Sequence, residues 1–166
     1  MVPEDRKMQG ILPNISVRGN ITVSMLKKLV SPIGFVMTDK EEQIARREIA
    51  ELNIKTPNSD KLIAQLSGGN QQKLIIAREV DNDPDVLIAV QPTRGLDVGA
   101  IEYVHKALIE ARDQGKAVLL VSLELDEVMD VSDRIAIIYD GTIVDTIDAE
   151  NADETHIGLL MAGGKK

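Results

Sequence analysis

The segment LSGGNQQK, residues 66–73, places a serine and two glycines directly before a stretch whose apolar residues have helical spacing. Ser67 is a typical N-cap residue, and the free N–H groups of a helix N-terminus attract anions. Glycines let a phosphate approach that backbone closely. The segment therefore predicts a capped helix over about 68–80 whose N-terminus suits an anion. The alternative is a capped helix with a glycine turn and no ligand.

The composition indicates a globular protein and excludes several kinds of function. The 166 residues are 43% hydrophobic and 28% charged, with a formal charge of −8, which argues against a general nucleic-acid binder. The absence of cysteine excludes disulfides, thiol catalysis and Cys-based zinc sites. His105 and His156 lie far apart in the sequence without a cluster of other ligands, so no metal site is predicted.

The hydrophobic pattern divides the chain near residue 81 into a helical part, 1–80, and an α/β part, 81–166. Helices are expected over 15–30, over 40–52 with Thr38-Asp39 as the cap, and over 68–80. Buried strands at 85–90, 117–123 and 134–140 alternate with helices at 97–113 and 124–131. Asp140-Gly141 predicts a hairpin turn into strand 142–147, and a helix is expected within 150–162. The fold class is therefore α/β with parallel strands.

The string LSGGNQQKLIIARE, from Leu66 onward, resembles the signature motif of ATP-binding-cassette (ABC) ATPases. Four other segments resemble the remaining motifs of that family, in the family's order. They are VPEDRKMQGILPNISVRGNI (2–21) for the Q-loop region, DVLIAVQPTRGLD (85–97) for the Walker B strand and D-loop, VSLELDEV (121–128) for the switch-histidine segment, and SDRIAIIYDGTIV (132–144) for the strand and hairpin that follow. PEDRK and QPTRGLDVGA resemble the second, C-terminal cassette of double-cassette importers for simple sugars and nucleosides. The resemblance covers nearly the whole chain and implies a partial P-loop NTPase core with a helical subdomain.

The resemblance implies which residues face a nucleotide. In that family the signature residues contact ATP held by the Walker A loop of the opposite cassette, and the D-loop lies at the same interface. The positions that match are Ser67, Gly68, Gly69, Asn70 and Gln71 in the signature, and Gly95, Leu96 and Asp97 in the D-loop. ATP and Mg²⁺ are thus implied for a full transporter, with none expected to bind tightly to this chain.

Several positions depart from the family pattern. No G-x-x-x-x-G-K-[ST] loop occurs, so we expect the chain to be a fragment that starts near the Q-loop of a longer polypeptide. The positions of the two Walker B acids hold Val90 and Gln91, the switch-histidine position holds Leu123, and the Q-loop glutamine position holds Glu4. Val90 cannot help hold a metal and Gln91 cannot take a proton. No intact catalytic residue is expected, and the cassette's own ATP site is predicted to be degenerate.

The missing Walker A segment also affects the expected sheet. In the family its strand lies between the strands that match 117–123 and 134–140, so the sheet would have a gap at its centre. Unpaired strand edges and exposed apolar faces are unfavourable. We therefore expect the strands to rearrange or to pair with a second copy of the chain.

Individual residues also suit simpler structural roles. Asp97 starts a helix and suits an N-cap equally well, and Glu4-Asp5-Arg6 suits a surface charge cluster. Gln71 and Gln72 suit either a nucleotide contact or, for Gln72, a solvated first turn. Arg94 suits an interface or a surface salt bridge.

Two functions from different classes remain after these departures. One is the signature-bearing part of a transport ATPase, inactive alone. The other is a non-hydrolysing interaction or regulatory module of cassette ancestry. A free-standing ATPase fits poorly, because the chain has no phosphate-binding loop.

The resemblance also implies partners and a place in the cell. The partners are an N-terminal cassette of the same polypeptide, the permease subunits and, indirectly, a substrate-binding protein, with no nucleic acid. The implied location is the cytoplasmic face of the plasma membrane. The sequence does not identify the transported molecule, because specificity in such importers lies in the binding protein and the permease.

Overall fold

The computed structural model describes residues 1–164, and the chain forms two compact units, Met1–Val121 and Ser122–Lys166. The first unit contains α1 (Val17–Thr22), α2 (Leu26–Leu29), α3 (Thr38–Glu51), α4 (Gly68–Asp81), β1 (Val86–Val90), α5 (Val98–Asp113) and β2 (Ala117–Val121). The second contains α6 (Leu125–Val131), β3 (Arg134–Tyr139), β4 (Thr142–Asp148) and α7 (Glu154–Met161). The predicted α/β class is confirmed.

The boundary between the two compact units does not coincide with the predicted boundary between helical and α/β sequence. Contacts between α4 and α5 join the helical segments to β1 and β2 within one unit, which ends at Val121. The predicted boundary near residue 81 separates helical from α/β sequence and stays a prediction about subdomains.

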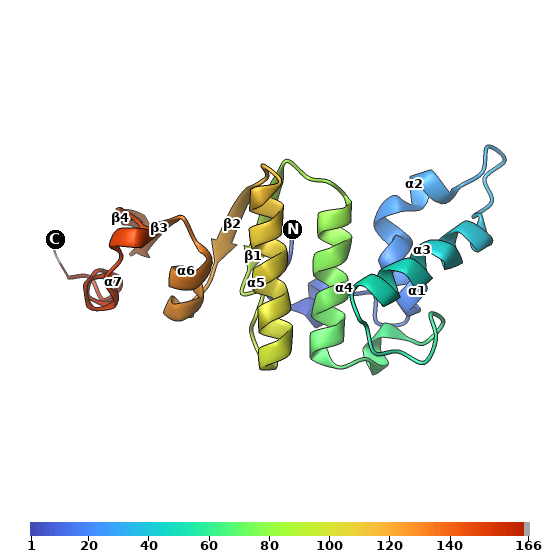
Figure 1. Cartoon of the computed structure of the whole chain (residues 1–166), viewed down its shortest axis with the longest axis horizontal. Coiled ribbons are helices and arrows are strands. Elements are labelled where there is room, and N and C mark those ends of the chain that lie inside the picture. The colour runs from blue at the N-terminus through green and yellow to red at the C-terminus, as the bar shows by residue number, and fades with distance from the viewer. Residues whose placement is uncertain (165–166) are drawn as a thin grey trace. The chain divides into compact units, whose positions relative to one another are not determined.

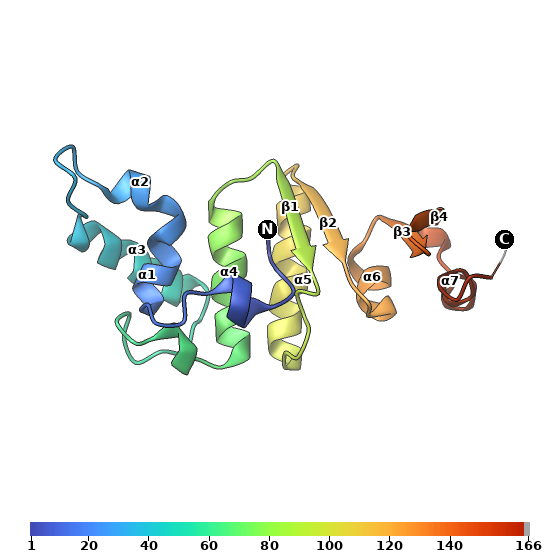
Figure 2. The ribbon, with the colours of Figure 1, turned by 180° about the vertical axis from the view of Figure 1, so that it is seen from behind.

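β1 and β2 form a parallel pair joined by α5, as the strand–helix–strand pattern predicts. The register runs from Val86 opposite Ala117 to Val90 opposite Val121. A parallel pair needs such a crossover connection, and α5 provides it. Figures 1 and 2 show α4 and α5 side by side, with α5 against one face of the two strands.

The sequence predicts buried strands, as in a sheet covered on both faces, but one face of β1 and β2 is partly exposed. Leu87 and Ala89 are buried, whereas the residues Val86 and Leu119 are 57% and 53% exposed. Successive side chains of a strand point to opposite faces, and within this unit helices cover only one of them (Figure 2). The apolar side chains on the uncovered face of β1 and β2, such as Val86 and Leu119, are therefore exposed to solvent.

The N-terminal segment is held along β1. The Val2 N–H donates to the Ile88 carbonyl at 2.8 Å, and the Val90 N–H donates to the Val2 carbonyl at 2.9 Å. Val2 is fully buried and packs in the main core with the three consecutive apolar residues of α4 at 74–76. This pairing places residues 4–6 next to the end of β1.

The helical segments before α4 differ in detail from the predictions. The helix expected over 15–30 is divided into α1, a 3₁₀ turn at Val23–Met25, and α2. α3 begins at Thr38, with Met37 at the N-cap and no side-chain cap, so the Thr38-Asp39 cap is wrong. Asp39 instead lies in the first turn, where a carboxylate interacts favourably with the helix dipole.

The second unit is a hairpin packed with α7. Asp140 and Gly141 have φ of 47° and 73°, which is the geometry of a tight hairpin turn, and the predicted turn is confirmed. Ile135 and Ile137 of β3 form a small buried cluster with Ile157 and Leu160 of α7. The sequence pattern predicts β3 as a third parallel strand, but within residues 1–164 it pairs only with β4, to which the short turn joins it.

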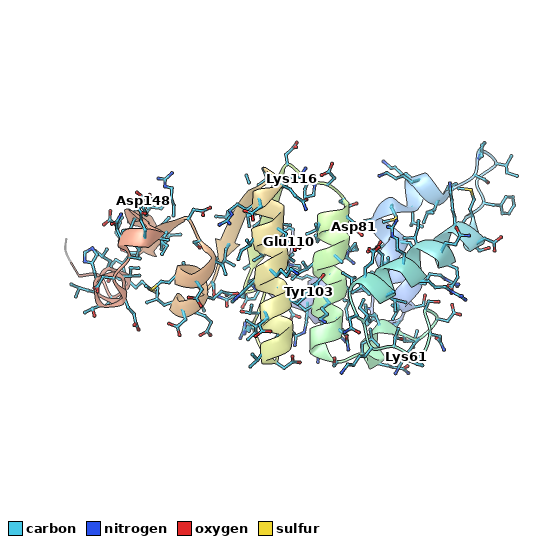
Figure 3. All side chains as sticks on the ribbon, in the orientation of Figure 1. Lys61, Asp81, Tyr103, Glu110, Lys116 and Asp148 are labelled. Carbon is cyan, nitrogen blue, oxygen red and sulfur yellow. The ribbon has the colours of Figure 1, made fainter. Side chains whose placement is uncertain are left out.

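A cluster of charged side chains lies where α3 meets the end of α4. Glu48 is buried and accepts hydrogen bonds from the Arg47 guanidinium. Asp81 ends α4 near Glu48 and lines the same pocket as Tyr103, and both residues are labelled in Figure 3. Partial burial, followed by the hydrogen bond and charge of Glu48, raises the pKa of Asp81 to about 6.

We expect Asp81→Asn to make the protein more stable at pH 7. The pKa of Asp81 rises from about 3.9 in the unfolded chain to about 6 in the folded chain. The folded state therefore binds more protons between these pH values, and wild-type stability falls as pH rises through this window. Asparagine cannot ionise, so the gain should be present at pH 7 and should disappear below pH 4.

Urea unfolding of both proteins at pH 4 and pH 7 measures this difference. Asp130→Asn, at an exposed position in α6, is the matched control and should change stability little at either pH. An equal effect of Asp81→Asn at both pH values would contradict the expected titration.

Candidate functional site

The N-terminus of α4 is capped by Ser67, as predicted. The Ser67 Oγ accepts a hydrogen bond from the Asn70 N–H at 3.4 Å and from the Asn70 side-chain amide at 2.9 Å. The Asn70 Oδ1 accepts from the Lys55 N–H at 3.2 Å, which ties the preceding loop to this turn. Ser67 itself is exposed, whereas Leu66 and Gly69 on either side of the turn are buried. The turn is thus anchored from beneath and open at its surface.

Gln71 supports the turn from inside. Its side chain is buried, and its Nε2 donates to the carbonyls of Ile63 and Leu66, each at 3.2 Å. Gln72 is buried too, so a solvated first turn is wrong for this residue. A direct contact between Gln71 and a nucleotide stays a prediction, and the structure uses its side chain to hold the backbone before α4.

The D-loop segment lies against this turn. Asp97 caps α5, and its Oδ1 accepts from the Ala100 N–H at 3.0 Å. A Cβ on Gly69 would lie 3.1 Å from the Ala100 Cβ and 3.3 Å from the Asp97 Oδ2. Glycine at position 69 therefore lets the N-termini of α4 and α5 approach closely. The structure brings Gly69 of the signature segment next to Asp97, and the role of these residues at a nucleotide stays a prediction.

The segment between β1 and α5 is a tight turn. The Arg94 N–H donates to the Gln91 carbonyl, and the Leu96 N–H donates to the Thr93 carbonyl. Gly95 has a φ of 67°, a conformation that glycine adopts without strain. This turn leads directly into the Asp97 cap of α5. Two helix N-termini, each with partial positive charge, therefore meet at one edge, which favours an anion there.

Glu4 lies beside the same turn. Its carboxylate forms an ion pair with the Arg94 guanidinium, and both side chains are at least half exposed. The surface salt bridge that the sequence allows for Arg94 is therefore present. Asp5 accepts hydrogen bonds from the backbone of Lys7 and Met8, so it caps the π-helical turn Arg6–Gly10.

The positions that match the Walker B acids do not suit a magnesium ion. Val90 ends β1 and has no side-chain oxygen, and Gln91 has only a neutral amide, whereas Mg²⁺ prefers carboxylates. Gln91 has a φ of 49°, and its N–H donates to the Val121 carbonyl at 2.8 Å. Leu123 belongs to the second unit and is 77% exposed. Within residues 1–164, no group of three or more acidic or histidine side chains could hold a metal ion.

A family profile described as ABC transporter matches residues 1–94, more than half of the chain. The chain belongs to the ABC transporter family. The fold of this ABC chain agrees with solved cassettes. It is similar to the ATP-binding cassette MJ0796 in a dimeric, post-hydrolysis state bound to ADP and Pi, with a TM-score of 0.69 and 23% identity over 86% of this chain and 61% of that one. A putative metal-chelate type ABC transporter in an inward-facing conformation gives a TM-score of 0.69 at 19% identity, over 89% of this chain and 58% of that one.

Curated relatives of this ABC chain are import ATP-binding proteins. It is 50% identical over 163 residues to the guanosine import ATP-binding protein NupO of Bacillus subtilis and 49% identical over 164 residues to the nucleoside import ATP-binding protein NupA of Lactococcus lactis. It is 39% identical over 162 residues to the ribose import ATP-binding protein RbsA of Caldanaerobacter subterraneus. Each match covers 98% of this chain but only 32% or 33% of the relative, so the chain spans about a third of their length. Over residues 1–164, no helix is long and apolar enough to cross a membrane.

Two substitutions at Asp97 distinguish the effect of its capping hydrogen bond on stability from the effect of its carboxylate charge. We expect Asp97→Ala to lower the free energy of unfolding of the first unit by about 1 kcal/mol, because α5 loses its N-cap. Asp97→Asn keeps a capping oxygen and should leave stability almost unchanged. Urea unfolding of the two variants measures this difference, and equal destabilisation by both would show that the charge rather than the cap stabilises α5.

Proposed function

We propose that this chain supplies the signature and D-loop half of an ATP site in an import ATPase. The observation that carries the proposal is the close packing of the capped N-terminus of α4 against the Asp97 cap of α5, at Gly69. Ser67 and Gly68 lie at the surface end of this arrangement, where backbone N–H groups and the dipole of α4 favour a phosphate. Asn70 and Gln71 hold the turn in place.

The nucleotide itself would be held by a partner cassette. The sequence has no phosphate-binding loop, and Val90, Gln91 and Leu123 stand where metal-binding, water-activating and phosphate-sensing groups would be needed. ATP and Mg²⁺ would therefore bind to the partner's residues, and this chain's own ATP site is degenerate. The pair would contain one hydrolytic site. The chain's contribution is to orient N–H donors toward the transferred phosphate, which stabilises the charge that develops there.

The relatives suggest the wider assembly. Their names describe import of guanosine, nucleosides and ribose, so we propose a nucleoside or simple sugar as the transported class. The partners would be an N-terminal cassette of the same polypeptide and the permease subunits, with a substrate-binding protein acting indirectly. The location would be the cytoplasmic face of the plasma membrane, where closure of two cassettes could move the permease.

A second candidate is a non-hydrolysing interaction module. The apolar and amide side chains at Val90, Gln91 and Leu123 favour it, because none of them can act as an acid or a base. The assembled signature turn opposes it, because a module that binds no nucleotide has no need of an exposed, anchored Ser67.

We expect ATP hydrolysis only when the chain is combined with the N-terminal cassette of the same polypeptide. The chain alone should be inactive, because its sequence contains no loop of the kind that holds the β and γ phosphates in P-loop ATPases. Ser67→Arg should lower hydrolysis by the pair at least about tenfold, since it places a bulky side chain at the oriented donors. Release of phosphate from ATP, measured for the chain alone, for the pair and for the variant pair, tests this.

Ser24→Arg is the matched control, because Ser24 is exposed outside the site and the substitution adds the same charge and bulk. Both substitutions should also be made in a polypeptide that joins this chain to the proposed N-terminal cassette. Turnover by the chain alone would overturn the proposal. Unchanged hydrolysis in the Ser67→Arg polypeptide would instead support the interaction module.

A further inference from the structure

Arg6 connects the N-terminal segment to the D-loop turn. Its Nη1 donates a hydrogen bond to the Arg94 carbonyl at 2.8 Å, across 88 positions of sequence. The pairing of Val2 with β1 and the cap formed by Asp5 set the path of the backbone that carries Arg6. The contact is made to the backbone of the turn and therefore does not depend on the Arg94 side chain.

The Arg6 guanidinium also lies against the signature turn. A Cβ on Gly68 would lie 2.8 Å from the Arg6 Nη2 and 3.3 Å from its Cζ, and one on Gly95 would lie 3.9 Å from Nη2. The guanidinium therefore occupies the space that a side chain at position 68 would need. It lies between the first residue of α4 and the turn that leads into α5.

The position of the Arg6 guanidinium is electrostatically unfavourable. The N-terminus of α4 is itself positive, and Arg6 forms no ion pair with the described residues, since Glu4 pairs with Arg94 instead. The Arg6 Nε is shielded from solvent and, within residues 1–164, makes no hydrogen bond. A buried donor without a partner is costly, so specific packing must hold the side chain here.

We propose that Arg6 is a positioning residue that fixes the signature turn against the D-loop turn. The planar guanidinium bonds to the Arg94 carbonyl with one edge and packs on Gly68 with the other. In this way the segment that matches the Q-loop, the signature and the D-loop become one rigid edge. The proposal rests on the proposed function only for its consequence, which is that the N–H donors at α4 are held in register for a phosphate.

Amide hydrogen exchange of the chain without nucleotide tests the positioning role directly. Arg6→Gln should speed exchange at the Leu96 and Asn70 amides about tenfold, the change expected when one hydrogen bond to a charged group is lost. The Val90 amide, which is bonded to Val2, should be unchanged and shows that the fold is intact. Lys7→Gln is the matched control, because it removes the same charge at the adjacent exposed position.

Two further variants separate the planar guanidinium from its charge and from the neighbouring ion pair. Arg6→Lys keeps the charge but cannot bond and pack with a planar fork, so it should resemble Arg6→Gln. Arg94→Ala removes the ion pair with Glu4 but keeps the carbonyl that Arg6 uses, so exchange should stay near the wild-type rate. Wild-type behaviour of Arg6→Lys, or an Arg94→Ala effect as large as that of Arg6→Gln, would overturn the proposal.

The consequence for catalysis is measured in the combined cassettes. Arg6→Gln should lower kcat for ATP hydrolysis with little change in KM, because the partner cassette holds the ATP. An exchange effect without any hydrolysis by the wild-type pair would contradict the proposed function and leave the positioning role intact. Normal exchange in Arg6→Gln beside an active wild-type pair would overturn the positioning role alone.

Discussion

The close approach of α4 and α5 at Gly69 is the contact on which the candidate site depends. A Cβ at this position would lie 3.1 Å from the Ala100 Cβ and 3.3 Å from the Asp97 Oδ2, so the neighbouring atoms would have to shift to accept a side chain. With glycine there, the caps at Ser67 and Asp97 lie at one edge of the first unit. The electrostatic consequence is additive, because both helix dipoles point their positive ends to this edge.

The same unit shows how an ABC chain is held together around an open sheet. Val2 pairs with β1, and the buried residues of α4 pack beneath it, so the core lies between the helices and one face of the strands. The other face leaves Val86 and Leu119 exposed. One face of the apolar strands of this ABC chain is thus exposed, and Ser67 in the signature turn is also accessible from solvent.

The accuracy of the sequence-based predictions follows the range of the interaction involved. The Ser67 and Asp97 caps and the Asp140-Gly141 turn are predicted correctly, because each depends on residues within a few positions. The burial of Gln72 and the exposure of the strands are not predicted correctly, because burial depends on which other elements pack against a residue. In the sequence Arg6 is only one member of a charge cluster, and its contact with the Arg94 carbonyl is what distinguishes it.

The sequence by itself determined the family and the apolar or uncharged side chains at Val90, Gln91 and Leu123, because side-chain chemistry does not depend on the fold. It also determined the local turns and caps. Only the tertiary structure decided that Gly69 meets Asp97, that Gln71 faces inward and that Arg6 reaches the D-loop turn. These contacts join residues from 5 to 88 positions apart. Most of them form only when separate helices and strands pack together, and a local sequence pattern does not specify that packing.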